Sequence, residues 1–167
     1  MPVTGHHLRH IASLGLVTLA AACGGAKEQP AASSTASAPA AAAPAAAGAT
    51  QFAVCAVCHQ ATGLGLPNTF PPLAGSEIVN GKADAHIRIV LQGVTGPFTV
   101  KGMQFNNTMP AQGAAMTDDD IAAVINFERS SWGNTGASVT AAQVAAIRAA
   151  TASRTTPWTE AELKAFR

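Results

Sequence analysis

The sequence has few of the residues that usually build a protein interior or a strongly charged surface. Aromatic residues make up 5% and charged residues 11% of its 167 residues, and the formal net charge is +1. This length is enough for one domain, and with so few aromatic side chains the domain buries only a modest core on its own. The weak charge excludes a field strong enough to indicate binding to nucleic acid or acidic substrates. The apolar run over residues 11–22 is too short to span a bilayer comfortably.

Cysteine is also scarce, and two of the three cysteines form one motif. They stand three positions apart and are followed at once by a histidine, in Cys55-Ala56-Val57-Cys58-His59. This spacing is typical of covalent attachment of a c-type haem. On a helical turn, positions i, i+3 and i+4 share a face, so all three side chains can meet one flat ligand. Each thiol can add across one vinyl group and the imidazole can coordinate the iron, so the motif predicts one covalently attached haem c.

Other uses of a Cys-x-x-Cys pair fit the sequence less well. A thioredoxin-like redox pair is expected beside a βαβ pattern, which is not visible in the sequence. A closed zinc site needs a second cluster of Cys or His ligands, which is absent too. A structural disulfide between Cys55 and Cys58 stays open in an oxidising compartment. The histidine directly after the second cysteine favours haem.

The first 47 residues are typical of an export signal followed by a tether. Residues 1–22 combine a weakly basic start with an apolar run, as in a secretory signal peptide. The signal ends in Leu19-Ala20-Ala21-Ala22-Cys23, which resembles a bacterial lipobox with Cys23 as the lipidated residue, although Ala20 stands where leucine is usual. An ordinary signal peptide is the alternative. Residues 23–47 are rich in alanine, proline and serine and predict a disordered tether. We therefore expect a protein on the periplasmic side of a bacterial membrane, held by a lipid anchor.

The rest of the chain predicts a helical domain over residues 48–134 and a helical C-terminal extension over residues 135–167. The extension shows two capping-box spacings, from Thr140 and from Thr159, and we expect it to pack on the domain rather than to serve as a docking arm for a partner. Hydrophobic periodicity predicts the following segments of the domain: a helix over residues 48–59, a helical turn over 76–80, a helix from Asp84 to Leu91, a loop over 93–113, and a helix from Thr117 to about Ser131. We expect Asp84 to cap the second of these helices, and Thr117 to open the last one with Asp120 as its capping-box partner.

Pro71 is a candidate for orienting the haem-binding histidine. It lies twelve residues after His59, in the stretch Phe70-Pro71-Pro72-Leu73-Ala74-Gly75. Consecutive prolines fix the backbone and donate no hydrogen bond, which leaves their carbonyl groups free to accept one. A metal-binding histidine usually donates its other ring N–H to such an acceptor. A rigid loop that packs on the haem is the alternative, and both can hold.

Met109 is the candidate for the second axial ligand of the iron. It lies in a loop before Pro110 and ahead of an amphipathic helix, and a rigid neighbour helps to hold a ligand loop. Met103 and Met116 are alternatives, each of which can instead pack in the core. His86 is the other imidazole after residue 47 besides His59. Its polar neighbours near a helix start predict a surface histidine rather than a ligand.

These motifs together resemble the class I cytochrome c family, in the family's order. The matching segments are Gly48-x-x-x-Phe52, the Cys55 to His59 motif, Pro71-x-Leu73-x-Gly75, Asn107-Thr108-Met109-Pro110 and Ile121 to Trp132. The likeness covers about residues 48–134 and is closest to bacterial monohaem subunits and domains that serve membrane dehydrogenases and oxidases.

The resemblance implies an all-α fold in which the first and last helices cross around a covalent haem. Gly48 with Phe52, and Val124 with Phe127, match the family's crossing pattern of a small residue under an aromatic. The step of three residues from Phe52 to Cys55 departs from mitochondrial members, which have four.

Function follows from the expected ligands. With His59 and Met109 both bound, the iron has no open position, so we expect a carrier of single electrons between periplasmic or membrane-bound redox proteins, and no enzyme. Residues 50–132 hold six acidic and four basic residues, a local charge of −2, which predicts weak, largely apolar docking. The alternative is a haem sensor or ligand-binding haem enzyme with a labile sixth ligand. It is disfavoured because the sequence shows no second histidine with an arginine for acid–base work.

Overall fold

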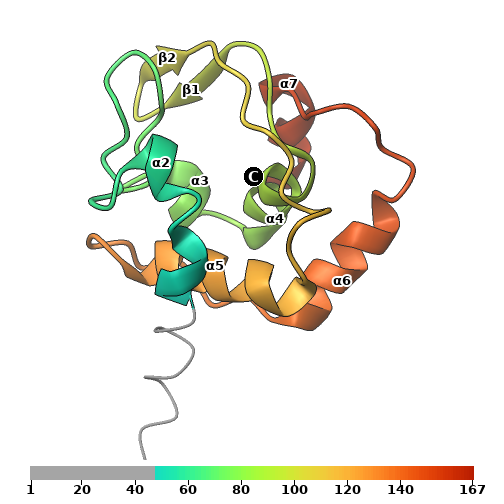
Figure 1. The fold of residues 1–167 in the computed structure, drawn as a ribbon. Helices are drawn as coiled ribbons and strands as arrows, with labels where there is room; N and C mark the ends of the chain where they lie inside the picture. Colours follow the sequence, from blue (N-terminus) through green and yellow to red (C-terminus); the bar gives the residue numbers. More distant parts are fainter. Residues whose placement is uncertain (1–47) are drawn as a thin grey trace, which may run out of the picture. The chain divides into compact units, whose positions relative to one another are not determined.

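The computed structural model describes residues 48–167. The predicted signal peptide, Cys23 and the tether lie outside these residues. A helical segment over residues 48–52 comes first, and the remaining elements are α2 (Ala56–His59), α3 (Glu77–Asn80), α4 (Ala83–Gln92), β1 (Phe98–Val100), β2 (Met103–Phe105), α5 (Asp118–Ser130), α6 (Ala141–Ala150), α7 (Glu160–Leu163) and the 3-10 turn η1 (Lys164–Phe166) (Figure 1). Within the described part of the chain, no helix is long and apolar enough to cross a membrane.

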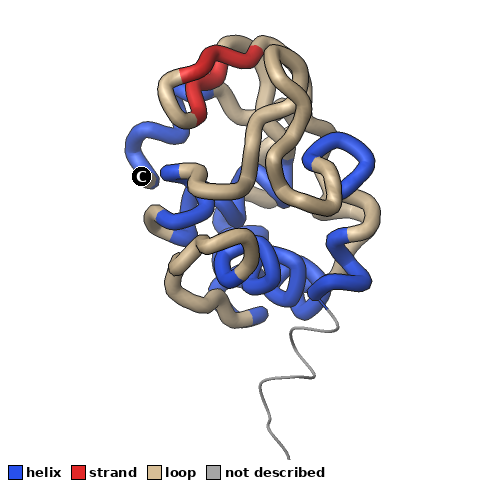
Figure 2. Tube along the Cα trace, turned by 90° about the vertical axis from the view of Figure 1, so that its left-hand side faces the viewer, coloured by secondary structure: helices blue, strands red, loops and turns tan. Residues whose placement is uncertain are grey.

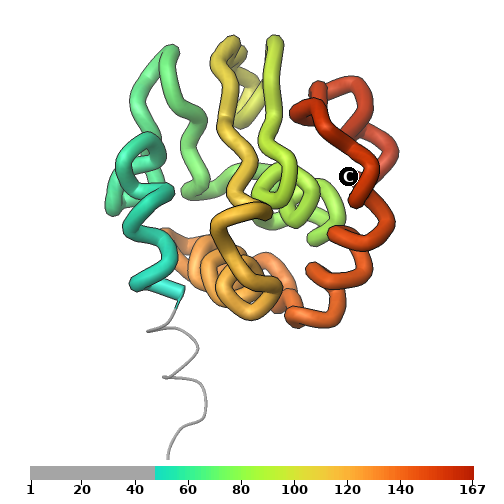
Figure 3. Tube along the Cα trace, turned by 45° about the vertical axis from the view of Figure 1, so that its right-hand side comes forward, coloured from blue at the N-terminus to red at the C-terminus, as the bar shows by residue number. Residues whose placement is uncertain are grey.

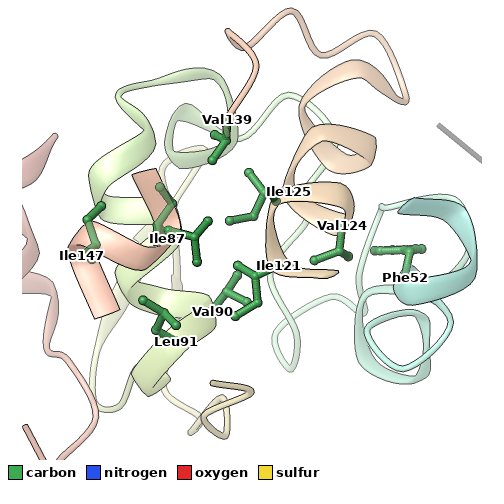
Figure 4. Packing of buried hydrophobic residues seen from close by; sticks show 11 residues of the cluster. Phe52, Ile87, Val90, Leu91, Ile121, Val124, Ile125, Val139 and Ile147 are labelled. Carbon is green, nitrogen blue, oxygen red and sulfur yellow. The ribbon is translucent and has the colours of Figure 1, made fainter. Parts of the chain in front are cut away.

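Helix α5 organises the main core. Its start is fixed by the predicted capping box, in which Thr117 and Asp120 each accept a bond from the other's backbone N–H. One face of α5 packs against α4 and α6, and each aliphatic side chain buried there contributes roughly 1.5–3 kcal/mol. We call this group the main core cluster; its buried members are Phe52, Ile87, Val90, Leu91, Ile121, Ala122, Val124, Ile125, Val139, Val144 and Ile147 (Figure 4).

The helical segment over residues 48–52 crosses α5 at close range. A β-carbon placed on Gly48 would lie 2.8 Å from Cβ of Phe127, so only glycine allows this approach. Phe52 then packs its ring against Phe127 and Trp132, with centroids 5.2 and 5.1 Å away. The expected crossing is therefore present. The predicted continuous helix over 48–59 is wrong, because residues 53–55 form a turn with Cys55 N–H bonded to Phe52 O, three residues back.

The segment predicted as a loop over residues 93–113 contains a small antiparallel hairpin. Strands β1 and β2 pair Phe98 with Phe105 and Val100 with Met103. Alternate side chains of this hairpin, including Phe98 and Val100, are buried, which is the pattern of a strand with one covered face. The hairpin lies at the end of the domain away from α5 (Figures 1 and 2). The described part of the chain is therefore mainly helical, as expected, with one two-stranded sheet in addition.

Helix α4 begins one residue earlier than predicted and is not capped by Asp84. Its N-cap residue is Lys82, whose side chain makes no capping bond, and Asp84 lies in the first turn. A carboxylate there still interacts favourably with the partial positive charge of the helix N-terminus.

The C-terminal extension folds back onto the domain (Figure 3). Both predicted capping boxes are confirmed, from Thr140 to Gln143 and from Thr159 to Glu162. Helix α6 packs on α4 and α5, and Arg148 on α6 forms an ion pair with Asp118 on α5, with 2.8 Å between Nε and Oδ1.

Trp158 and Leu163 of the extension, by contrast, join a second core cluster around the hairpin. Its buried members are Ile78, Ala85, Ile89, Phe98, Val100, Phe105, Trp158 and Leu163, with Val94, Met109 and Phe166 packed against them.

Candidate functional site

The predicted site residues meet in one cavity. Cys55, Cys58, His59, Pro71 and Met109 all line it, although 54 positions separate the first from the last. The cavity measures about 960 Å³ including the part open to solvent. Most of its walls are apolar and come from α3, α4, the hairpin and the proline-rich loop: Phe70, Pro72, Leu73, Ile78, Val79, Ile89, Val90, Val94, Phe98, Val100 and Phe105.

Cys55 and Cys58 lie at the start of α2 and are not joined by a disulfide. Burial, helped by the nearby charge of Glu128, raises the pKa of the Cys55 thiol to about 12. Both cysteines line the cavity, which is where a thioether to a bound haem requires their sulfur atoms.

His59 is buried and oriented by a backbone carbonyl. It is the last residue of α2, and its Nδ1 lies 2.9 Å from the carbonyl oxygen of Pro71. Because that oxygen can only accept, Nδ1 must carry the proton, and the lone pair of Nε2 is left for a metal. Pro71 therefore stands where an orienting acceptor was predicted.

Gly65 allows the Pro71 carbonyl to reach His59. The loop turns at Gly65 with φ +65°, its N–H donates to the His59 carbonyl, and a β-carbon there would lie 2.6 Å from the Pro71 oxygen. The role of Gly65 could not be predicted, because nothing in a single sequence shows which backbone passes a glycine at close range.

Replacing Gly65 with alanine should therefore disturb His59 as well as stability. We expect a loss of about 1–3 kcal/mol from the positive φ alone. Displacing the carbonyl also weakens the bond to Nδ1, which makes the imidazole less basic and raises the reduction potential of the holoprotein. Chemical denaturation and a redox titration measure the two effects.

The hairpin turn offers a matched control for that experiment. Gly102 also has a positive φ, +73°, but a β-carbon there meets no atom within 4 Å. Gly102→Ala should lower stability by a similar backbone term and leave the potential unchanged. Equal shifts in potential for both variants would show that the Gly65–Pro71 contact does not orient His59.

Of the three methionines in the described residues, Met109 alone lines the cavity. Its main chain pairs with Val94, with Met109 N–H donating to Val94 O at 2.9 Å. Met103 points outward from β2 and is 47% exposed, and Met116 packs against the main core cluster.

His86 is not a surface residue, and this prediction is wrong. The residue is 3% exposed, it lines the cavity, and its Nε2 lies 2.7 Å from Oε2 of Glu128, which is equally buried. The pairing of two polar groups offsets the cost of removing both from water. A signal was present in the sequence: Glu128 continues the apolar stripe of Ile121, Val124 and Ile125, and a carboxylate on a buried stripe needs a buried partner.

The cavity fits a haem on features of its own. Two thiols and an oriented imidazole stand on one helical turn, and a thioether sulfur comes from a distant segment, inside largely apolar walls. Nδ1 of His86 is buried there without a hydrogen-bond partner among the described residues, so the cavity also has a polar atom to offer to the edge of a bound group. The fold and site define a helical protein with a covalently attached haem c.

Comparisons with known proteins give the family. The family model described as Cytochrome c matches residues 45–132, more than half of the chain. Cytochrome c-552 of Thermus thermophilus is 43% identical over 91 residues, which cover 52% of this chain and 69% of that protein. The chain belongs to the cytochrome c family, as a monohaem member of class I, and it is an electron carrier with one covalently attached haem c.

Subunits of larger enzymes are similar too. The gluconate 2-dehydrogenase cytochrome c subunit of Pantoea cypripedii is 42% identical over 97 residues, covering 56% of this chain and 22% of that protein. The alcohol dehydrogenase (quinone) cytochrome c subunit of Gluconacetobacter polyoxogenes is 36% identical over 97 residues, covering 56% of this chain and 20% of that protein. The chain thus spans only about a fifth of these subunits.

Proposed function

We propose that this protein carries single electrons on an iron bound by His59 and Met109, without catalysing a reaction itself. The observation that carries the proposal is the convergence of these two side chains on one cavity with both attachment cysteines. His/Met ligation raises the potential above that of bis-histidine iron and fills both axial positions. Such an iron exchanges electrons but has no free position for a substrate.

Each part of the chain has a separate task in this carrier. The bound haem supplies the one-electron Fe³⁺/Fe²⁺ couple. Cys55 and Cys58 fix the haem to α2, and the Pro71 carbonyl holds the His59 ring in place. Apolar side chains of α4 and the hairpin limit the access of water, which helps to set the potential.

The surface near α2 supports weak apolar docking of redox partners. Val57, inside the attachment motif, is 77% exposed, and Leu64 and Leu66 in the following loop are 62% and 47% exposed. Electron-transfer encounters use small interfaces of below about 1,200 Å². The similar dehydrogenase subunits support exported or membrane-bound oxidoreductases as donors or acceptors.

We further propose that the protein is exported and held at a membrane by a lipid on Cys23. The lipobox-like sequence supports this, and a tether over residues 23–47 would raise the effective concentration of the domain near a membrane partner. Cys23→Ala should move the holoprotein from the membrane fraction to the soluble periplasmic fraction. Retention of the variant in membranes would contradict the lipid anchor.

A redox titration of the purified holoprotein tests the carrier. We expect one reversible transition with a slope of about 59 mV per decade, the value for one electron. Steady consumption of peroxide by the protein with a reducing dye would contradict a carrier and indicate an enzyme.

One observation favours the second candidate, a haem sensor or ligand-binding enzyme. The cavity contains a second histidine, His86, beside the carboxylate of Glu128, although His86 was predicted to lie at the surface. No arginine is among the described residues that line the cavity, and His86 is already engaged by Glu128. Binding of carbon monoxide to the reduced holoprotein, which the carrier should resist, separates the two candidates.

A further inference from the structure

A backbone segment of the C-terminal extension joins the segment that carries Met109. Val94 forms an antiparallel bridge with Met109 on one side and a parallel bridge with Trp158 on the other. On the side of Met109, Met109 N–H donates to Val94 O at 2.9 Å and Val94 N–H donates to Met109 O at 3.2 Å. Toward Trp158, its neighbours are bonded instead: Trp158 N–H donates to Gly93 O at 2.9 Å, and Thr95 N–H donates to Trp158 O at 2.8 Å. Residues 93–95 are thus held from both edges.

The Trp158 side chain is in turn firmly anchored. Its indole is 7% exposed and donates from Nε1 to Oε1 of Gln92 at 3.1 Å. The Arg154 guanidinium lies 3.6 Å from the ring centroid and that of Arg88 lies 5.3 Å from it. Phe166 packs edge-on at 5.8 Å. Cation–π and aromatic contacts of this kind contribute about 0.5–2 kcal/mol each, so they stabilise the position of the backbone at Trp158.

Other restraints on the Met109 loop lie on both sides of Met109. On the C-terminal side, Gln112 N–H donates to Val90 O at 2.9 Å and Gly113 N–H donates to Leu91 O at 3.1 Å. On the N-terminal side the restraints are weaker. Thr108 shares a hydroxyl–hydroxyl bond with Thr95, and Asn107 donates to the Thr69 carbonyl, but both bonds are exposed to solvent. Exposed bonds protect a loop poorly against local opening. The pairing with Val94 is the restraint at Met109 itself, and the residues on either side of Val94 are hydrogen-bonded to Trp158.

We propose that Trp158 is a positioning residue for Met109. By fixing residues 93–95, it holds the methionine loop in the conformation in which the thioether faces the cavity, so the C-terminal extension keeps the sixth ligand on the iron. The inference rests on the proposed ligation by Met109. The family match ends at residue 132, before the extension begins, so this function belongs to a part of the chain outside the shared domain.

Imidazole binding to the oxidised holoprotein tests the inference, because imidazole can bind only where Met109 has left the iron. The apparent affinity is the intrinsic affinity multiplied by the fraction of open loop. We expect Trp158→Ala to raise the imidazole affinity at least about tenfold, and to weaken the methionine–iron absorption band at a lower pH than in the wild type. Trp158→Phe keeps an aromatic ring in the cluster but loses the hydrogen bond to Gln92. It replaces the alanine variant if that variant does not fold, and we expect it to raise the imidazole affinity a few-fold.

Val144→Ala is the matched control. Val144 is fully buried on α6 of the same extension, but it belongs to the main core cluster. The substitution Val144→Ala should lower the free energy of unfolding by about 1–3 kcal/mol without changing the imidazole affinity. Equal affinities in the wild type and both Trp158 variants, or an equal rise in Val144→Ala, would overturn the inference. If imidazole affinity does not respond to Met109→Ala either, the ligand assignment itself fails, and the inference fails with it.

Discussion

Met109→Ala is expected to abolish the weak methionine–iron absorption band of the oxidised holoprotein and to lower its reduction potential. A thioether favours Fe²⁺, so its loss should shift the potential by a substantial part of the roughly 0.8 V range that axial ligands span. The freed position should also allow the reduced protein to bind carbon monoxide. The visible spectrum and a redox titration measure these effects.

The other methionines supply controls for this result. Met103 is exposed on β2 and Met116 packs against the main core cluster, so neither approaches the cavity. Met103→Ala and Met116→Ala should keep the band, the potential and the resistance to carbon monoxide. If one of them removes the band instead, the sixth ligand has been assigned to the wrong residue.

His86→Leu is expected to destabilise the holoprotein by about 3–5 kcal/mol. The substitution leaves the Glu128 carboxylate buried at 3% exposure without the imidazole that lies 2.7 Å from it. A buried charge without a partner is costly because neither water nor protein dipoles replace its lost hydration. Denaturant unfolding of the holoprotein measures the loss in free energy.

The double variant His86→Leu/Glu128→Leu tests whether the cost comes from the unpaired carboxylate. Replacing both members of a buried pair by apolar residues is often neutral or stabilising, so the double variant should regain most of the stability lost in His86→Leu. A double variant as unstable as the sum of the two single variants would mean that the two side chains do not interact.

The sequence was informative where chemistry dictates spacing. The attachment motif requires Cys55, Cys58 and His59 on one turn, and the capping boxes at Thr117, Thr140 and Thr159 are local patterns that the structure confirms. The crossing of Gly48 and Phe52 with α5 was available only through the resemblance to the family, because a contact 75 residues away leaves no local mark.

Features that depend on long-range packing could not be predicted in the same way. His86 looked exposed because its neighbours in sequence are polar, whereas its burial depends on Glu128, 42 residues away. The hairpin was missed because each strand is only three residues long. The contact between Trp158 and residues 93–95 joins two segments whose sequences show no pattern of pairing.

Exposure of the reduced wild-type holoprotein to carbon monoxide, followed by its visible spectrum, tests whether both axial positions of the iron are filled. Both axial positions are assigned here to the protein's own side chains, His59 and Met109, so the spectrum should stay unchanged. Rapid conversion to a carbon monoxide complex would show an open or labile position, and the protein would then be a ligand-binding haem protein rather than a simple electron carrier.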